Sequence, residues 1–93
     1  MELLAGITAR RVPTERLTLN VLERAGDRPN GIPVVLVHGN VSSSLFWQET
    51  MQALPPEYRV VAPDLRGFGQ TDTAPVDASH GLRDFADDLH GLL

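Results

Sequence analysis

The sequence contains no cysteine, which excludes disulfide bonds, thiolate metal sites and a cysteine nucleophile. It has no run of about 18 apolar residues, so it predicts no membrane-spanning helix. Near the N-terminus, Arg10 and Arg11 follow a short apolar piece instead of preceding it, the wrong order for a secretory signal. We therefore expect a cytoplasmic protein.

Positive charge is also scarce. Eight basic residues stand against twelve acidic ones, giving a formal net charge of −4, and this balance argues against a nucleic-acid-binding surface. Hydrophobic residues make up 42% and charged residues 22%, which is ordinary globular composition. A chain of 93 residues is short for a doubly wound α/β enzyme.

The N-terminal third predicts an antiparallel hairpin. Residues 7–12 and 16–23 are β-prone, and the second segment alternates apolar and polar residues as a half-buried strand does. Residues 13–15 form the connection. Residues 24–32, with their Gly, Pro and Asn, are typical of a surface loop.

The middle of the chain predicts a strand–helix–strand unit. Residues 33–37 are a continuous apolar run, typical of a parallel strand covered on both faces. Residues 44–54 have helical apolar spacing, on a face that includes Trp47, and two prolines follow. Residues 58–62 predict the second strand. Such units are almost always parallel and right-handed.

After a loop over residues 63–78, a last helix is expected with Ser79 as its N-cap. Its acidic residues, Asp84, Asp87 and Asp88, are expected on a solvated face and not at a metal site. One face of this helix is apolar: Leu82, Phe85, Ala86, Leu89 and Leu93. The chain ends at Leu93 without a C-cap or a following strand, as expected of a truncated domain.

Two segments carry chemistry. The first follows residues 33–37, where His38 and Gly39 place the next backbone amides at the edge of the sheet that binds ligands. Gly39 would let the chain turn without a clash at Cβ. The amides of Asn40 and Val41 are then candidate donors to a tetrahedral oxyanion, and losing one such donor typically costs about 10²–10³ in rate.

The second segment follows the other buried strand. Asp64 can accept hydrogen bonds from loop amides, and Arg66 can pair with a carboxylate, so the loop can brace itself. Gly67 and Gly69 supply unusual backbone angles. A dinucleotide-binding turn is rejected here, because the fingerprint requires Gly at the position of Asp72 and because the next helix begins too late.

Together the two segments resemble the α/β-hydrolase superfamily, whose members carry His-Gly-x after one strand and Asp-x-Arg-Gly-x-Gly-x-Ser after the next. Thr71 stands where Ser is usual. The resemblance spans essentially residues 1–93 and implies an α/β fold with a hairpin, the first parallel strands and two helices. It implies that the His-Gly strand lies beside the nucleophile strand and that the amide of Asn40 is one oxyanion donor. No Gly-x-Ser-x-Gly occurs in the sequence, so the 93 residues alone are expected to be inactive.

Individual residues also have plain structural interpretations. In the resembling family the His at position 38 is a turn residue, and the catalytic His lies later. His80 and His90 lack metal-ligand spacing. Dehalogenases of this family have Asn at position 40, where its side chain helps to hold the halide, but the backbone amide alone is the simpler interpretation. Phe46 is a candidate substrate-pocket residue, whereas Trp47 is expected in the core.

The resemblance implies a hydrolase of a small, apolar molecule. A carboxylic ester or lactone, cleaved by a Ser-His-acid triad outside this chain, is the first expectation. The alternative is a haloalkane dehalogenase or epoxide hydrolase with an Asp nucleophile. A third hypothesis is an inactive chain that assembles with a second chain completing the sheet, because an open apolar edge favours a partner. No metal or organic cofactor is implied.

Overall fold

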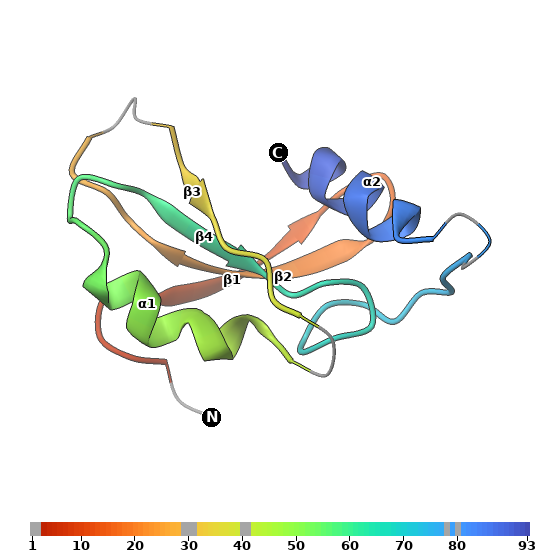
Figure 1. Cartoon of the computed structure of the whole chain (residues 1–93), viewed down its shortest axis with the longest axis horizontal. Helices are drawn as coiled ribbons and strands as arrows, with labels where there is room; N and C mark the ends of the chain where they lie inside the picture. Colours follow the sequence, from red (N-terminus) through yellow and green to blue (C-terminus); the bar gives the residue numbers. More distant parts are fainter. Residues whose placement is uncertain (1–2, 29–31, 40–41, 78, 80) are drawn as a thin grey trace.

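The computed structural model describes residues 3–28, 32–39, 42–77, 79 and 81–93. Within these ranges four strands form one mixed sheet in the order β1-β2-β4-β3 (Figure 1). Their bounds are β1 (Thr8–Pro13), β2 (Thr18–Arg24), β3 (Val34–Val35) and β4 (Val60–Pro63). The α/β class expected from the sequence is confirmed, and the sheet is a partial version of that fold.

The predicted hairpin is confirmed. β1 and β2 pair antiparallel, from Thr8 opposite Glu23 to Pro13 opposite Thr18. The hydroxyl of Thr14 closes the turn by donating to the carbonyl of Leu17 at 2.8 Å. β2 also pairs antiparallel with β4, so β2 is an inner strand and its residues are largely buried.

The predicted strand–helix–strand unit is also confirmed, because β3 runs parallel to β4 with Val34 opposite Val60. β3 is shorter than expected, although the N–H of Leu36 still donates to the carbonyl of Val61 at 2.9 Å. β4 begins two residues later than expected. The N–H of Tyr58 donates to the carbonyl of Pro55 at 3.2 Å, and this turn delays the strand.

The connection between these strands is helical, as predicted. A 3₁₀ turn, η1 (Ser44–Trp47), runs into α1 (Gln48–Ala53), and the hydroxyl oxygen of Ser43 accepts from the N–H of Leu45 at 3.3 Å. At the other end Arg24 of β2 donates to four backbone carbonyls, those of Met51, Leu54, Pro55 and Tyr58. A cation at the C-terminal end of a helix is electrostatically favourable.

Side chains that alternate along the strands build a core on each face of the sheet. Leu22, Val60 and Ala62 lie on the face of the sheet that α1 covers. They pack with Met51 of α1, which has no exposed surface. Trp47 packs on this cluster, as predicted. On the opposite face a second cluster carries Leu17, Leu19, Val21 and Val61. Covering on both faces explains why β4 is an unbroken apolar segment.

The last helix, α2 (Arg83–Leu92), lies against the second face, where Leu92 packs on the core. The prediction that Ser79 caps this helix is wrong, because the residue before its first turn is Leu82. Both the N–H and the hydroxyl of Ser79 donate instead to Asp77. No helix among the described residues is long and apolar enough to cross a membrane.

Candidate active site

His38 lies three residues after β3 and is 5% exposed. Its Nε2 accepts from the N–H of Leu65 at 2.9 Å, and its Nδ1 lies 2.8 Å from the carbonyl oxygen of Gly39. A backbone N–H can only donate, so Nδ1 carries the proton and donates to Gly39. The ring also makes a T-shaped contact with Phe68, at 5.2 Å between ring centroids. His38 is therefore a structural residue with both nitrogens occupied, in agreement with its interpretation as a turn residue.

Gly39 is exposed, and a Cβ added to it would meet no atom within 4 Å. The structure thus does not support a clash at Cβ as the reason for glycine here. The two predicted oxyanion donors, Asn40 and Val41, lie outside the described residues, as does His80. The candidate site is therefore described from the residues around positions 40 and 41.

Asp64 follows β4 and is 2% exposed. Its Oδ1 accepts from the N–H of Ser44 at 2.7 Å, and its Oδ2 accepts from Asn20 Nδ2 and from the N–H of Gln70, both at 3.0 Å. Burial by itself would raise the pKa of Asp64, but the hydrogen bonds from Gln70, Ser44 and Asn20 outweigh it and hold the pKa below its usual value. The predicted acceptance of loop amides is confirmed.

Gly69 and Thr71 complete the surroundings of Asp64. Gly69 has φ +50°, and a Cβ there would collide with the carboxylate of Asp64. Thr71, the departure from the family's Ser, donates from Oγ1 to the carbonyl of Asp64 at 2.7 Å and accepts from the N–H of Asn20 at 2.8 Å. Both bonds are made by the hydroxyl group, which Thr and Ser have in common.

Arg66 is the second anchor of this loop. Its guanidinium donates to both oxygens of Asp88 on α2, at 2.9 and 2.8 Å, and to the carbonyl of Pro75 at 2.6 Å. Arg16, from the hairpin turn, donates to Asp88 at 2.8 Å and to Asp84 at 3.1 Å. The predicted pairing of Arg66 with a carboxylate is confirmed.

The expected solvated acidic face on the last helix is wrong for Asp88, which has no exposed surface. Sequence reasoning missed both Asp88 and its partner Arg16. A usable signal was present, because Asp88 lies three residues after Phe85 and four before Leu92, within the apolar face of the helix. An acidic residue at such a position indicates a buried partner.

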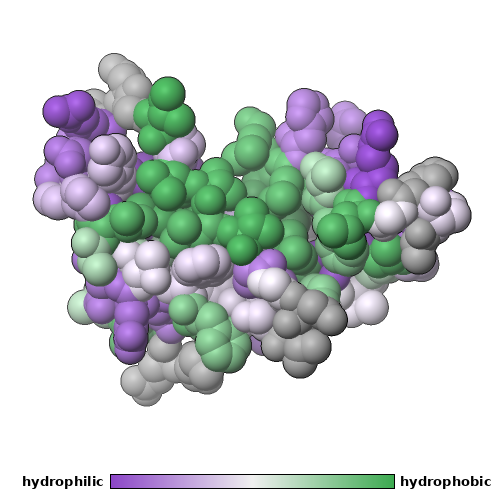
Figure 2. Space-filling view, viewed as in Figure 1, coloured by the Kyte–Doolittle hydropathy of each residue, from purple (hydrophilic) through white to green (hydrophobic). Residues whose placement is uncertain are grey.

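An apolar groove of about 660 Å³ opens between the His38–Gly39 segment and α2. Figure 2 shows apolar side chains gathered in a band across this face of the molecule. The residues that line the groove include Val37, Leu65, Phe68, Leu82, Phe85 and Leu89. The predicted apolar face of the last helix thus faces the end of β3.

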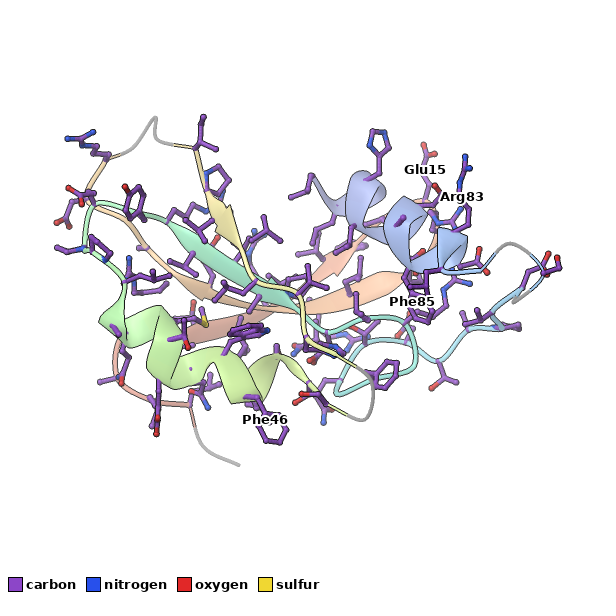
Figure 3. The ribbon with its side chains drawn as sticks, in the orientation of Figure 1. Glu15, Phe46, Arg83 and Phe85 are labelled. Carbon is purple, nitrogen blue, oxygen red and sulfur yellow. The ribbon has the colours of Figure 1, made fainter. Side chains whose placement is uncertain are left out.

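The predicted substrate-pocket residue, Phe46, does not line this groove. It lies on η1, is 73% exposed and points away from the sheet (Figure 3). Phe85 of α2 lines the groove instead.

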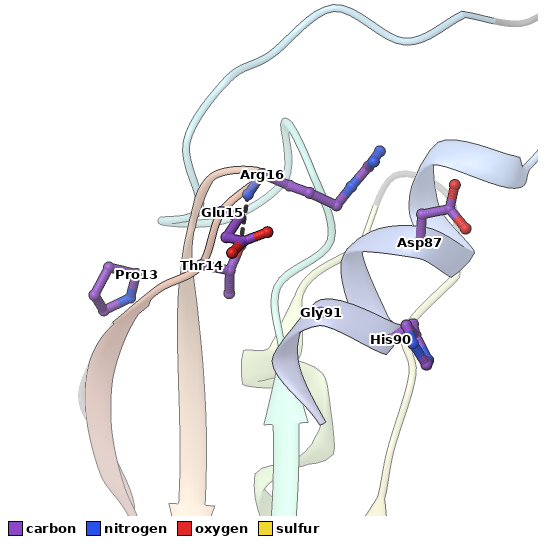
Figure 4. Close-up of a pocket in the computed structure, with 7 residues that line it drawn as sticks. All are labelled: Pro13, Thr14, Glu15, Arg16, Asp87, His90 and Gly91. Carbon is purple, nitrogen blue, oxygen red and sulfur yellow. Dashed lines mark hydrogen bonds between the residues drawn. The ribbon is translucent and has the colours of Figure 1, made fainter.

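A second hollow lies between the hairpin turn and α2, lined by residues that include Glu15, Arg16, Asp87 and His90 (Figure 4). The guanidinium group of Arg16 in this hollow already pairs with Asp84 and Asp88. Among the residues that the structure describes, no group of three or more His, Asp or Glu side chains suits a metal ion. The hollow is therefore a weaker candidate for a substrate site than the groove.

The comparisons with known proteins agree with this geometry. Residues 32–93 match the family described as the alpha/beta hydrolase fold, and this chain belongs to that family. It is 33% identical over 79 residues to an epoxide hydrolase from Caballeronia sordidicola and 32% identical over 72 residues to a haloalkane dehalogenase from Agrobacterium fabrum. These matches cover 84% and 77% of this chain.

A solved structure, a loop variant of a haloalkane dehalogenase from Bradyrhizobium elkanii, matches 95% of this chain with a TM-score of 0.80 and 32% identity. The chain spans 28% of that structure and 22% of each of the two sequence relatives. The likeness therefore shows the family and the fold, and the activity of a whole enzyme is a matter for proposal.

Proposed function

We propose that this chain forms the oxyanion-hole part of a hydrolase that acts on a small apolar molecule. The observation that carries the proposal is the end of β3, where His38 has both ring nitrogens bonded and the chain opens onto an apolar groove. Backbone amides fixed before reaction at such a place stabilise a developing oxyanion. The relatives support a hydrolase, since they carry the names of hydrolytic enzymes.

We propose an epoxide or a haloalkane as the substrate class, because the relatives are named for those substrates. An aspartate nucleophile from outside the 93 residues would attack a carbon atom of the substrate. A C–O bond then forms as the epoxide oxygen or the halide leaves with its electron pair. Water next gives up a proton to a base outside the 93 residues and adds to the carbonyl of the resulting ester, and the N–H of Asn40 would stabilise the oxyanion. Collapse of the oxyanion breaks the acyl C–O bond, which restores the aspartate and releases the alcohol. The side-chain amide of Asn40 is also suited to hold the departing halide.

The carboxylic ester or lactone expected from the sequence is the second candidate. Its hydrolysis by a serine nucleophile also passes through a tetrahedral oxyanion, so the same backbone donor would serve it. The motif after β3 is common to both reactions, and the identity of the nucleophile separates them.

The same proposal explains two further features of the chain: the apolar groove, and the position of β3 at the edge of the sheet. Val37 and Leu82 are 44% and 77% exposed along it, and apolar surface of this kind favours a partner. We propose that the polypeptide that carries the nucleophile covers this groove, either as more of the same chain or as a second chain.

The test is a chimera in which residues 1–93 replace the matching segment of the Caballeronia sordidicola epoxide hydrolase. It is assayed with styrene oxide, 1-bromobutane and p-nitrophenyl acetate. Because the chimera takes its nucleophile from the host enzyme, it tests the oxyanion-hole part of the proposal. Turnover of the epoxide supports that part, and a folded chimera without turnover contradicts it. The substrate class is decided by the nucleophile of the polypeptide that completes this chain: an aspartate supports the epoxide or haloalkane, and a serine supports the second candidate.

Two variants of the chimera test the backbone donor itself. Asn40→Pro removes the N–H and should lower kcat by about 10²–10³, whereas Asn40→Ala keeps the N–H and should retain epoxide turnover. Thermal melting of both variants separates this loss from misfolding. Equal activity of the two variants would contradict a role for the amide.

A further inference from the structure

The loops that follow β3 and β4 are joined at two places, on either side of residues 39–43. On one side the N–H of Leu65 donates to His38 at 2.9 Å. On the other side the N–H of Ser44 donates to Asp64 at 2.7 Å. Asp64 and Leu65 are adjacent in the chain, so one short stretch after β4 holds both ends of this segment.

The bond to Ser44 belongs to a carboxylate whose two oxygens both accept hydrogen bonds. Three donors converge on Asp64, from Ser44, Asn20 and Gln70. An asparagine would offer a single oxygen acceptor and would direct an NH₂ group at one of these donors. In a site that is 2% exposed, a donor left without an acceptor is costly.

We propose that Asp64 is a positioning residue for the oxyanion hole, acting by holding the chain at Ser44 while His38 holds it at Gly39. This inference rests on the proposed function, because that function assigns the donor amide to residues 39–43. The inference adds a role for the side chain of Asp64, which holds the C-terminal end of residues 39–43 through Ser44. Removing the carboxylate should free the Ser44 end and leave the His38 end bonded.

Asp88 provides a matched control. It is also a fully buried carboxylate with strong hydrogen bonds. Its partners are Arg66 and Arg16, and none of its bonds reaches residues 38–44. Asp88→Asn should therefore reduce stability without a specific effect on that segment.

The first experiment measures amide hydrogen exchange on the 93-residue chain. In Asp64→Asn, exchange of residues 39–44 should rise by about tenfold or more, because a hydrogen bond to a charged acceptor is lost. In Asp88→Asn it should rise no more than exchange in the core strands does. A uniform increase in both variants, or no increase in Asp64→Asn, would overturn the proposal. This readout needs no activity, so it stands even if the proposed function fails.

The second experiment measures turnover in the chimera. Slower attack of water on the covalent ester should lower kcat and KM together in Asp64→Asn and leave kcat/KM nearly unchanged. The ester intermediate should accumulate and appear in the intact mass. A merely structural role would lower kcat and kcat/KM by the same factor, as we expect for Asp88→Asn. A chimera inactive with every substrate would count against the proposed function alone, and hydrogen exchange would still decide the role of Asp64.

Discussion

Gly67 and Gly69, two residues apart in the loop after β4, both have positive φ, at +76° and +50°. Only Gly69 faces a neighbour, since a Cβ there would collide with Asp64, whereas a Cβ at Gly67 would meet nothing within 4 Å. Gly67→Ala should therefore cost about 1 kcal/mol for the left-handed backbone alone.

Gly69→Ala should cost about 3 kcal/mol, because the displacement of a buried carboxylate is added to the backbone cost. Urea unfolding of the two variants measures the difference. Equal losses of stability would show that the loop can move away from Asp64, contrary to the packing described above.

Asp64 also predicts a pH dependence. Its pKa is lowered in the folded chain, so the unfolded chain takes up a proton first as the pH falls. The stability that Asp64 contributes is fully present above about pH 4, the unfolded value, and is lost as the pH falls through the lower folded value. The difference in unfolding free energy between the wild type and Asp64→Asn should shrink below that pH.

Urea unfolding of the wild type and of Asp64→Asn at a series of pH values from neutral to acid measures this difference. An Asp64→Asn profile that stays parallel to the wild type below pH 4 would contradict the assignment.

Several of these residues could be predicted from the sequence and others could not. Asp64 as an acceptor and Arg66 as a partner of a carboxylate follow from the motif, because short loops must satisfy their own polar groups. The partners Asn20 and Asp88 are 44 and 22 residues away from them along the chain. The position of Asp88 on the apolar face of its helix indicates burial, but no local pattern specifies which residues pair over that range.

At the scale of elements, the ion cluster that holds α2 makes a sharp prediction. Asp88 is buried between Arg66 and Arg16, and Asp88→Asn would remove the buried charge that the two guanidinium groups share, leaving them with Asp84 at the rim of the cluster. Removing one partner of a buried ion pair typically lowers the free energy of unfolding by about 3–5 kcal/mol. Asp87→Asn, on the exposed side of the same helix, should cost less than about 1 kcal/mol. Chemical denaturation followed by far-UV circular dichroism measures both. Similar losses for the two variants would show that α2 does not depend on the cluster.

Element types were predicted more reliably than their ends. Apolar periodicity located the hairpin, the parallel strands and both helices, because burial sets that periodicity. The ends depend on particular hydrogen bonds instead. Asp77 binds Ser79, so α2 starts at Arg83 and not after Ser79. Tyr58 bonds back to Pro55, so β4 starts at Val60.

At the scale of the whole molecule, the sheet has a core on both faces, and an apolar groove lies between the chain after β3 and α2. The two-motif pattern identified the family because it specifies the turns after β3 and β4. It did not identify the reaction, because the motif after β3 is common to the reactions proposed above and the chain spans 22% of each of its two sequence relatives. Phe46 illustrates the limit: it is 73% exposed and does not line the groove, so its role in a substrate pocket stays a prediction.

The open groove predicts the behaviour of the 93-residue chain in solution. Apolar surface at Leu82 and Val37 should make the chain self-associate and bind a hydrophobic dye. Leu82→Lys introduces a charge at the rim of the groove and should reduce both effects, because a desolvated ammonium group is unfavourable. Phe46→Lys is the matched control, since Phe46 is similarly exposed but lies outside the groove. Sedimentation velocity and dye fluorescence measure the two variants beside the wild type. If Phe46→Lys restored the monomer as well as Leu82→Lys does, general apolar exposure and not the groove would drive the association.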